Sequence, residues 1–205
     1  QDQLPKQIIR IAGVDVTYTG DLAIGAATVL DYSSLEVLET QTVTQQARFP
    51  YIPTLFSFRE LPVIISAIRK LNLQPDVALI DGHGIAHPYR CGLANHLGVT
   101  LGKPTIGVAK NILIGEVKQV GQETFLIDEG ETVGAVIPSF GSVKPVYVSI
   151  GHMVSLKTAV EVVKHCLRSS RIPEPINTAH MAASKERKNK IIENIVIMRG
   201  HHVGS

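Results

Sequence analysis

Short apolar runs at the start of the chain carry the clearest strand signal. Three of them are rich in β-branched residues, at Ile8–Tyr18, Ala23–Leu30 and Leu35–Val43. Turn residues separate the runs, with Gly20-Asp21 after the first and Asp31–Ser34 after the second. Runs of this length joined by short turns are typical of antiparallel strands. We therefore predict a three-stranded antiparallel meander.

The next part of the chain changes from strand to helix periodicity. Apolar residues recur at helical spacing over Thr54–Leu71, which predicts a helix with a kink or a late start at Pro62. Val77–Ile80 predicts a strand buried on both faces, and Cys91–Leu97 has helical character. The later predicted elements are strands at Thr105–Lys110, Ile112–Gln119, Glu123–Leu126, Val133–Ile137 and Val146–Ser149, a helix over Leu156–Leu167 after an N-cap at Ser155, a stiff linker at Arg171–Pro175 and a helix that begins at Thr178.

This order of elements is that of a ribonuclease H-like fold. The meander is followed by a helix, a buried strand, further strands and late helices. We therefore expect an α/β protein in which helices flank a mixed sheet. A length of 205 residues predicts one domain, 1–205, with a flexible C-terminal tail at 198–205.

The composition fits a folded protein and leaves several function classes open. Hydrophobic residues make up 44% of the chain and charged residues 19%, which excludes global disorder. The net charge of +2 is compatible with nucleic-acid binding without indicating it. Cys91 and Cys166 form no C-x-x-C pair, so neither a zinc knuckle nor a disulfide framework is expected. No apolar run reaches the ~18 residues of a membrane span. We expect a cytoplasmic protein without a membrane partner.

The stretch from Asp76 to Gly98 contains the strongest local signal for a site. Its apolar strand ends abruptly on Asp81, which is followed by Gly82, His83 and Gly84. Ligand sites in α/β sheets commonly lie where a buried strand ends, and glycines let the backbone turn tightly and approach a ligand. The alternative is an ordinary strand, loop and helix with a solvated Asp81.

Two further carboxylates join Asp81 in the predicted fold. Asp15 lies between Val14 and Val16, where burial is costly unless the carboxylate is paired or binds metal; on its own it is more simply an edge or turn residue. Glu60 is alternatively a solvated partner of Arg59. In a ribonuclease H-like fold the three acids converge at one end of the sheet, where a divalent cation would relieve their repulsion.

Long strings in this sequence closely resemble those of the endonuclease V family, the deoxyinosine 3′-endonucleases. The matching strings are GVDVTY at 13–18, PYIPTLFSFRE at 50–60, DGHGIAHPYRCGLANHLGV at 81–99, PTIGVAK at 104–110, SIGH at 149–152, and the RIPEP and AH elements within 171–180. The match covers about Ile11 to Ser184.

The resemblance implies a catalytic role for four residues. Asp15, Glu60 and Asp81 are the expected metal ligands, with Mg²⁺ as the cofactor and Mn²⁺ able to substitute. His180 stands at the position of the family's fourth catalytic residue. Because His is a poor Mg²⁺ ligand, we expect it to position water rather than to coordinate the ion. The alternative is an ordinary histidine on a helix surface.

The resemblance also implies a set of substrate contacts. Tyr51 would act as a wedge, held rigid in the segment Pro50, Ile52 and Pro53, and the alternative is an aromatic ring in the core. A flipped-out hypoxanthine would enter a pocket, with backbone N–H groups facing its O6 atom. The expected pocket residues are Phe56, Gly82, His83, Gly84, Ile85 and Leu113. His87 and Lys110 would contact the substrate nearby, with Lys110 a point charge for phosphate or the metal-site edge.

One position departs from the family pattern. Where the family often has two arginines after His-Pro, this chain has Tyr89 followed by Arg90. Any role of the first family arginine is therefore in doubt here. His152, within SIGH, is expected to order the end of the sheet rather than to do chemistry.

The expected function is that of a monomeric, metal-dependent DNA repair endonuclease that acts on inosine-containing DNA. It would hydrolyse the second phosphodiester bond 3′ to a deaminated purine and leave 3′-OH and 5′-phosphate ends. Three alternatives remain open: an endoribonuclease for inosine in single-stranded RNA, another ribonuclease H-like nuclease such as an excision-repair incision domain, and a non-catalytic inosine-binding module.

Overall fold

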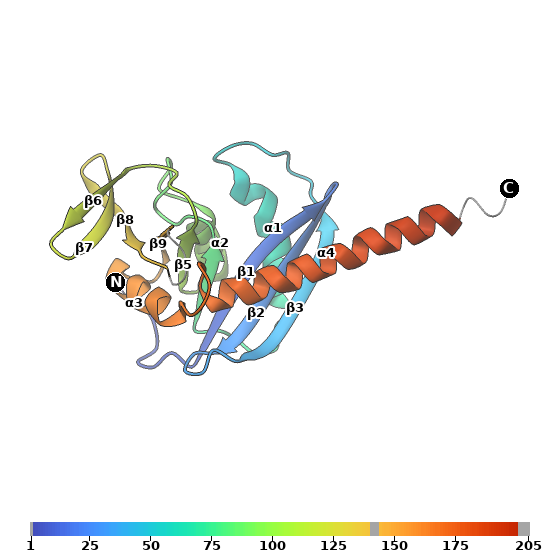
Figure 1. Ribbon diagram of the computed structural model, residues 1–205, viewed down its shortest axis with the longest axis horizontal. Coiled ribbons are helices and arrows are strands. Elements are labelled where there is room, and N and C mark those ends of the chain that lie inside the picture. The colour runs from blue at the N-terminus through green and yellow to red at the C-terminus, as the bar shows by residue number, and fades with distance from the viewer. Residues whose placement is uncertain (1, 140–143, 201–205) are drawn as a thin grey trace.

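A nine-stranded mixed sheet forms the centre of the protein in the computed structural model, which describes residues 2–139 and 144–200, the stretch 194–200 for its backbone alone. The strands lie in the order β3-β2-β1-β4-β5-β9-β8-β7-β6 (Figure 1). The strands are β1 (Arg10–Thr19), β2 (Leu22–Asp31), β3 (Val37–Gln46), β4 (Val77–Asp81), β5 (Thr105–Ala109), β6 (Glu116–Val120), β7 (Glu123–Asp128), β8 (Glu131–Ile137) and β9 (Val146–His152). The helices are α1 (Phe56–Arg69), α2 (Leu93–Leu101), α3 (Leu156–Cys166) and α4 (Glu174–Gly200).

The strand pairing confirms the predicted mixed sheet. Strands β1, β2 and β3 form the antiparallel meander, in which Arg10 pairs with Asp31 and Leu22 with Gln46. Strand β4 then runs parallel to β1, and β5 runs parallel to β4. Strand β9 returns antiparallel to β5, and β8, β7 and β6 continue the sheet as antiparallel neighbours.

Alternation along β1 divides the core between the two faces of the sheet. Ala12 and Val14 pack with α1 on one face. Ile11 packs on the other face with α3 and with Ile176 of α4. Side chains at alternate positions of a strand point to opposite faces of the sheet. Gly13 and Asp15, the neighbours of Val14, therefore face α4 rather than α1.

Helix α4 lies directly on the first two strands because Gly13 has no side chain. A Cβ built on Gly13 would stand 1.8 Å from the carbonyl oxygen of Pro175. The Thr28 hydroxyl donates to the same carbonyl at 3.1 Å and lies 3.0 Å from the Thr178 hydroxyl. These contacts fix the N-terminal part of α4, while its later turns extend past the sheet (Figure 1).

Several predicted boundaries are wrong, each for a local reason. Helix α1 runs through Pro62 from Phe56, so its start is not delayed to the proline. Helix α4 begins at Glu174 rather than Thr178, because Pro175 falls in its first turn, where no N–H is needed. Helix α2 begins at Leu93, and β6 is confined to Glu116–Val120.

Two expectations concern the chain as a whole. Helix α4 continues to Gly200, and residues 201–205 of the predicted tail lie outside the described residues, so its flexibility stays a prediction. In the part of the chain that the structure describes, no helix is long and apolar enough to cross a membrane.

Candidate active site

Asp15 and Asp81 lie on adjacent parallel strands where β4 ends. Val14 of β1 is aligned with Ile80 of β4, and each aspartate is the next residue of its strand. Parallel strands in register place such residues side by side on the same face. Asp15 is buried and Asp81 is partly buried. The structure therefore brings these two predicted site residues together.

His180 reaches Asp15 from α4. Its Nδ1 atom lies 2.8 Å from Oδ2 of Asp15, and half of its side chain is exposed. The position of the ring follows from the close contact of Pro175 with Gly13, one and a half turns earlier on the same helix. The ring of His180 has one nitrogen paired with Asp15 while half of the side chain is exposed, an arrangement that suits a histidine that orients water. The pairing distinguishes His180 from an ordinary surface histidine.

Lys110 stands directly after β5 and compensates Asp81. Its Nζ atom lies 2.5 Å from Oδ2 of Asp81. The carbonyl of Lys110 accepts a hydrogen bond from the Arg171 guanidinium, which also donates to the carbonyl of Pro145 at 3.0 Å. Arg171 thus supports the lysine from the segment before α4. It was not predicted as a site residue, although it opens the matched RIPEP string.

Glu60 approaches from α1, on the opposite face of the sheet. Only 5% of this residue is exposed. Burial, followed by the charges of Asp15 and Asp81, raises the pKa of Glu60 well above its usual range. Glu60 therefore belongs to the same electrostatic group as the two aspartates, although α1 and α4 cover different faces.

The neighbouring cations do not offset the burial and mutual repulsion of the carboxylates. The pKa of Asp15 is raised by burial first and by Asp81 next, against the opposing effects of His180 and Lys110. A divalent cation with oxygen ligands would relieve this repulsion. Within residues 2–139 and 144–193, no three His, Cys, Asp or Glu side chains are gathered into a ready-made metal cage. The donor set fits Mg²⁺, which uses one or two carboxylates and keeps several waters.

An exposed aromatic loop lies before α1. Tyr51 is 68% exposed, and Pro50, Ile52 and Pro53 around it are exposed as well. The alternative of a tyrosine held in the core is therefore wrong. The Tyr51 ring meets the ring of Phe56 edge-on, with centroids 5.8 Å apart.

Arg59 ties this loop to the first strand. Its guanidinium donates to the carbonyl of Phe49 at 2.5 Å and lies over the Tyr18 ring, 4.8 Å from the centroid. Arg59 directly precedes Glu60, and Tyr18 lies three residues after Asp15. The loop and the carboxylates are thus joined through one side chain that sequence reasoning treated only as a partner for Glu60.

The segment after β4, residues 82–85 (the glycine loop), was expected to offer free backbone N–H groups, but three of them form hydrogen bonds within the protein. Gly82 N–H donates to Val108 at 3.1 Å, and Ile85 N–H donates to Ile150 at 2.8 Å. Gly84 N–H donates to the Ser149 hydroxyl at 2.7 Å. These three N–H groups are paired within the protein and are not free to face the O6 atom of a base, whereas the place of His83 and of the other named residues in a base pocket stays a prediction. Leu113 is exposed after β5, and its place in a base pocket stays a prediction.

The environments of His83 and His87, which follow β4, both favour the uncharged imidazole ring. Burial lowers the pKa of His83 to about 4 and also lowers the pKa of His87. His87 accepts from the Tyr89 N–H at 3.3 Å through Nδ1 and also hydrogen-bonds the backbone of Thr54. His87 therefore connects the glycine loop to the aromatic loop. His152, at the end of β9, packs against Gly98 of α2, as expected for a residue that orders the sheet end.

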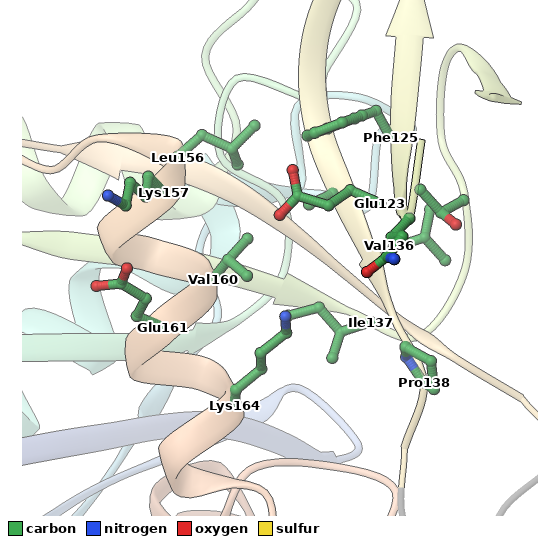
Figure 2. Close-up of a pocket in the computed structure, with 13 residues that line it drawn as sticks. Glu123, Phe125, Val136, Ile137, Pro138, Leu156, Lys157, Val160, Glu161 and Lys164 are labelled. Carbon is green, nitrogen blue, oxygen red and sulfur yellow. The ribbon is translucent and has the colours of Figure 1, made fainter. Parts of the chain in front are cut away.

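A separate hollow of about 580 Å³ lies away from these residues, between α3 and the strands β7 and β8 (Figure 2). Val160 and Ile137 form part of its apolar lining, and Lys164 extends from α3 toward Ile137 across it. None of the predicted site residues lines this hollow.

Known proteins with similar sequences and structures place the chain in a family. The model of the Endonuclease V family matches residues 1–181. Endonuclease V of Thermofilum pendens is 43% identical over 94% of this chain and 84% of its own length. The crystal structure of Endonuclease V from Streptomyces avermitilis aligns with a TM-score of 0.86 at 36% identity, over 93% of this chain and 88% of that one.

A further structural relative is Endonuclease V of Ciona intestinalis, which aligns with a TM-score of 0.81 at 33% identity, over 89% of this chain and 87% of that one. Its crystal structure contains a 23mer DNA with an inosine followed by a ribo-adenosine. The family match spans the meander, the carboxylates and the start of α4. The chain therefore belongs to the Endonuclease V family of nucleases and has its ribonuclease H-like fold.

Proposed function

We propose that the protein is a Mg²⁺-dependent endonuclease for inosine-containing DNA. It would hydrolyse the second phosphodiester bond 3′ to the inosine and leave 3′-OH and 5′-phosphate ends. The observation that carries this proposal is the convergence of the buried Asp15 and Glu60 with the partly buried Asp81, whose charges repel one another, beside an exposed aromatic loop. Such a carboxylate group is suited to holding a divalent cation against a phosphodiester.

Asp15 and Asp81 would hold the ion, with Glu60 completing its environment from the other face. When bound, the ion would lower the pKa of a water and stabilise charge on the leaving oxygen. His180, hydrogen-bonded to Asp15 and half exposed, would orient the attacking water. The Lys110 ammonium, 2.5 Å from Asp81, would contact the phosphate as the substrate approaches.

The aromatic loop would supply lesion recognition. Tyr51 projects into solvent on a proline-flanked segment, so its ring needs little ordering when nucleic acid binds. Beside it, a hollow of about 480 Å³ is lined by residues that include Phe49, Phe58, Arg48 and Arg59. Aromatic faces and guanidinium groups are the usual contacts for unpaired nucleotides.

Inosine in single-stranded RNA is the second candidate substrate. The Ciona intestinalis complex contains a ribonucleotide next to the inosine, which shows that a relative accommodates a 2′-OH there. A protein that requires this hydroxyl would cut RNA faster than DNA.

The deciding experiment is cleavage of end-labelled single strands with one inosine, in DNA and in RNA, with Mg²⁺, with Mn²⁺ and with EDTA. We expect metal-dependent cutting of DNA at the second 3′ bond and none of a matched strand without inosine. Faster cutting of RNA would reassign the substrate. Binding of inosine without cutting of either strand would leave a binding module.

A further inference from the structure

Tyr89 is an exposed aromatic residue with no role in the proposed function so far. It is 67% exposed in the loop between β4 and α2. Among the side chains that the structure describes, the other exposed aromatic rings are Tyr51, Phe56 and Phe58, all from the aromatic loop and the start of α1. The exposed face of this ring is free to stack on a nucleobase.

The turn that carries Tyr89 is joined to the aromatic loop through His87. The rings of Tyr89 and His87 lie with centroids 5.7 Å apart. His87 is buried and also hydrogen-bonds the backbone of Thr54, within four residues of Tyr51. Tyr89 and Tyr51 therefore project from two loops that one buried side chain holds together.

The turn that carries Tyr89 is fixed before any ligand binds. Tyr89 N–H donates to the His87 ring at 3.3 Å, and Arg90 N–H donates to the His87 carbonyl at 2.7 Å. Arg90 adopts a left-handed backbone with φ of 51°, which a non-glycine residue holds only when its surroundings impose it. Its guanidinium lies 2.7 Å from Asp128.

Arg90 is not available as a phosphate contact. Besides Asp128, it faces Glu129 at 3.8 Å and Glu131 at 3.5 Å. Three carboxylates around one guanidinium leave the cluster with net negative charge, which repels a phosphate backbone. This side of the site therefore offers nucleic acid a ring face rather than a free cation.

We propose that Tyr89 stacks on an unpaired base that flanks the lesion, as a second aromatic contact beside Tyr51. The proposal rests on the proposed function, because it names how this chain holds the strand that the carboxylates would cut. An aromatic ring stacks on any base and requires that the base be unpaired. Tyr89 thus favours a single-stranded or locally opened substrate over a fully paired duplex.

The test is binding of a fluorescent inosine-containing single strand in EDTA, so that cleavage does not interfere. Tyr89→Ala should weaken binding by roughly tenfold, as expected for the loss of one stacked base. Tyr89→Phe should stay within about twofold of the wild type, because the ring face is kept. Val117→Ala, on the exposed strand β6, is the control for loss of a surface apolar group.

The Tyr89→Phe variant separates stacking from a hydroxyl contact with phosphate. A neutral hydroxyl releases no counterion, so the slope of log Kd against log salt should be the same for the wild type and both variants. A Tyr89→Phe variant as weak as Tyr89→Ala would show that the hydroxyl makes the contact and would overturn the proposal. Equal affinity of Tyr89→Ala and wild type would overturn it as well.

Failure of the proposed function would look different. In that case the wild type would neither prefer the inosine strand nor cut it, whatever residue stands at 89. Melting temperatures of the variants within a few degrees of the wild type would show that the exposed position is not needed for folding. If Tyr89→Ala weakened binding of a fully paired duplex without inosine as much as binding of the single strand, Tyr89 would not be contacting an unpaired base, and the proposal would be overturned.

Discussion

The protein contains two groups of acidic residues that differ in what neutralises them. Asp15 and Glu60, with the partly buried Asp81 beside them, form the buried group, where burial raises the pKa of both Asp15 and Glu60. Asp128 and Glu131, with Glu129 in the turn between β7 and β8, form the exposed group around Arg90. The exposed acids have solvent and a guanidinium, whereas the buried acids repel one another across the end of the sheet.

The difference teaches how to recognise a site among acids of the same kind. Exposed acids beside an arginine cost the fold little, because water screens them. Buried like charges reduce stability, and a protein retains them where a ligand supplies the missing positive charge. The number of acids in the sequence does not separate the two groups. The burial of Asp15 and Glu60 does, since the side chains of Asp81 and Asp128 are similarly exposed, at 21% and 23%.

The largest expected effect comes from removing a carboxylate of the buried group. Asp81→Ala should reduce cleavage of an inosine strand by on the order of a thousandfold or more, because the site loses a metal ligand. Binding of the strand in EDTA should be largely retained. Gel-based cleavage and anisotropy measure the two quantities, and Glu36→Ala, in an exposed turn, is the matched control. Equal loss of cutting and binding would contradict the metal-site assignment.

A smaller effect, of opposite sign, is expected on stability. Glu60→Gln should raise the melting temperature by a few degrees at neutral pH in EDTA, since it removes a buried charge that Asp15 and Asp81 repel. Because the folded-state pKa of Glu60 lies above its unfolded value of 4.5, the wild type loses stability as pH rises through this interval. The advantage of the variant should therefore disappear below about pH 4.5, where the glutamate is protonated in both states. Thermal unfolding across pH 4 to 8 measures this, and a pH-independent difference would contradict it.

The smallest effect is expected in the exposed group. Asp128→Asn should lower the free energy of unfolding by less than about 1 kcal/mol, although the ion pair with Arg90 is short at 2.7 Å, because both side chains are partly exposed. Urea denaturation measures it. A loss of several kcal/mol would mean that this cluster is as strongly coupled to the fold as the buried one.

The sequence was sufficient to predict the ribonuclease H-like sheet, because its signals are local and repeated. The meander follows from three β-branched runs with short turns, and the position of Asp81 follows from an apolar run that ends in glycines. The long strings around Asp15, Glu60 and Asp81 predicted the family, and the comparisons confirm it.

What the sequence could not predict depends on contacts between distant segments. The N–H groups of Gly82, Gly84 and Ile85 look free in the sequence, yet β5 and β9 supply their acceptors. Helix α4 starts at Glu174, earlier than predicted, because Pro175 lies in its first turn, where a proline is tolerated. The support of Lys110 by Arg171 joins residues 61 positions apart, and no local pattern announces it.

The close contact of Gly13 with Pro175 also has a consequence for biosynthesis. Asp15 and His180 are 165 residues apart, so the ribosome delivers one long before the other. A nascent chain can pair its first strands early but has no helix to place on Gly13 until the residues of α4 have emerged from the ribosome. The site therefore stays incomplete until then, and a chain that terminates before His180 lacks the histidine that faces the first carboxylate.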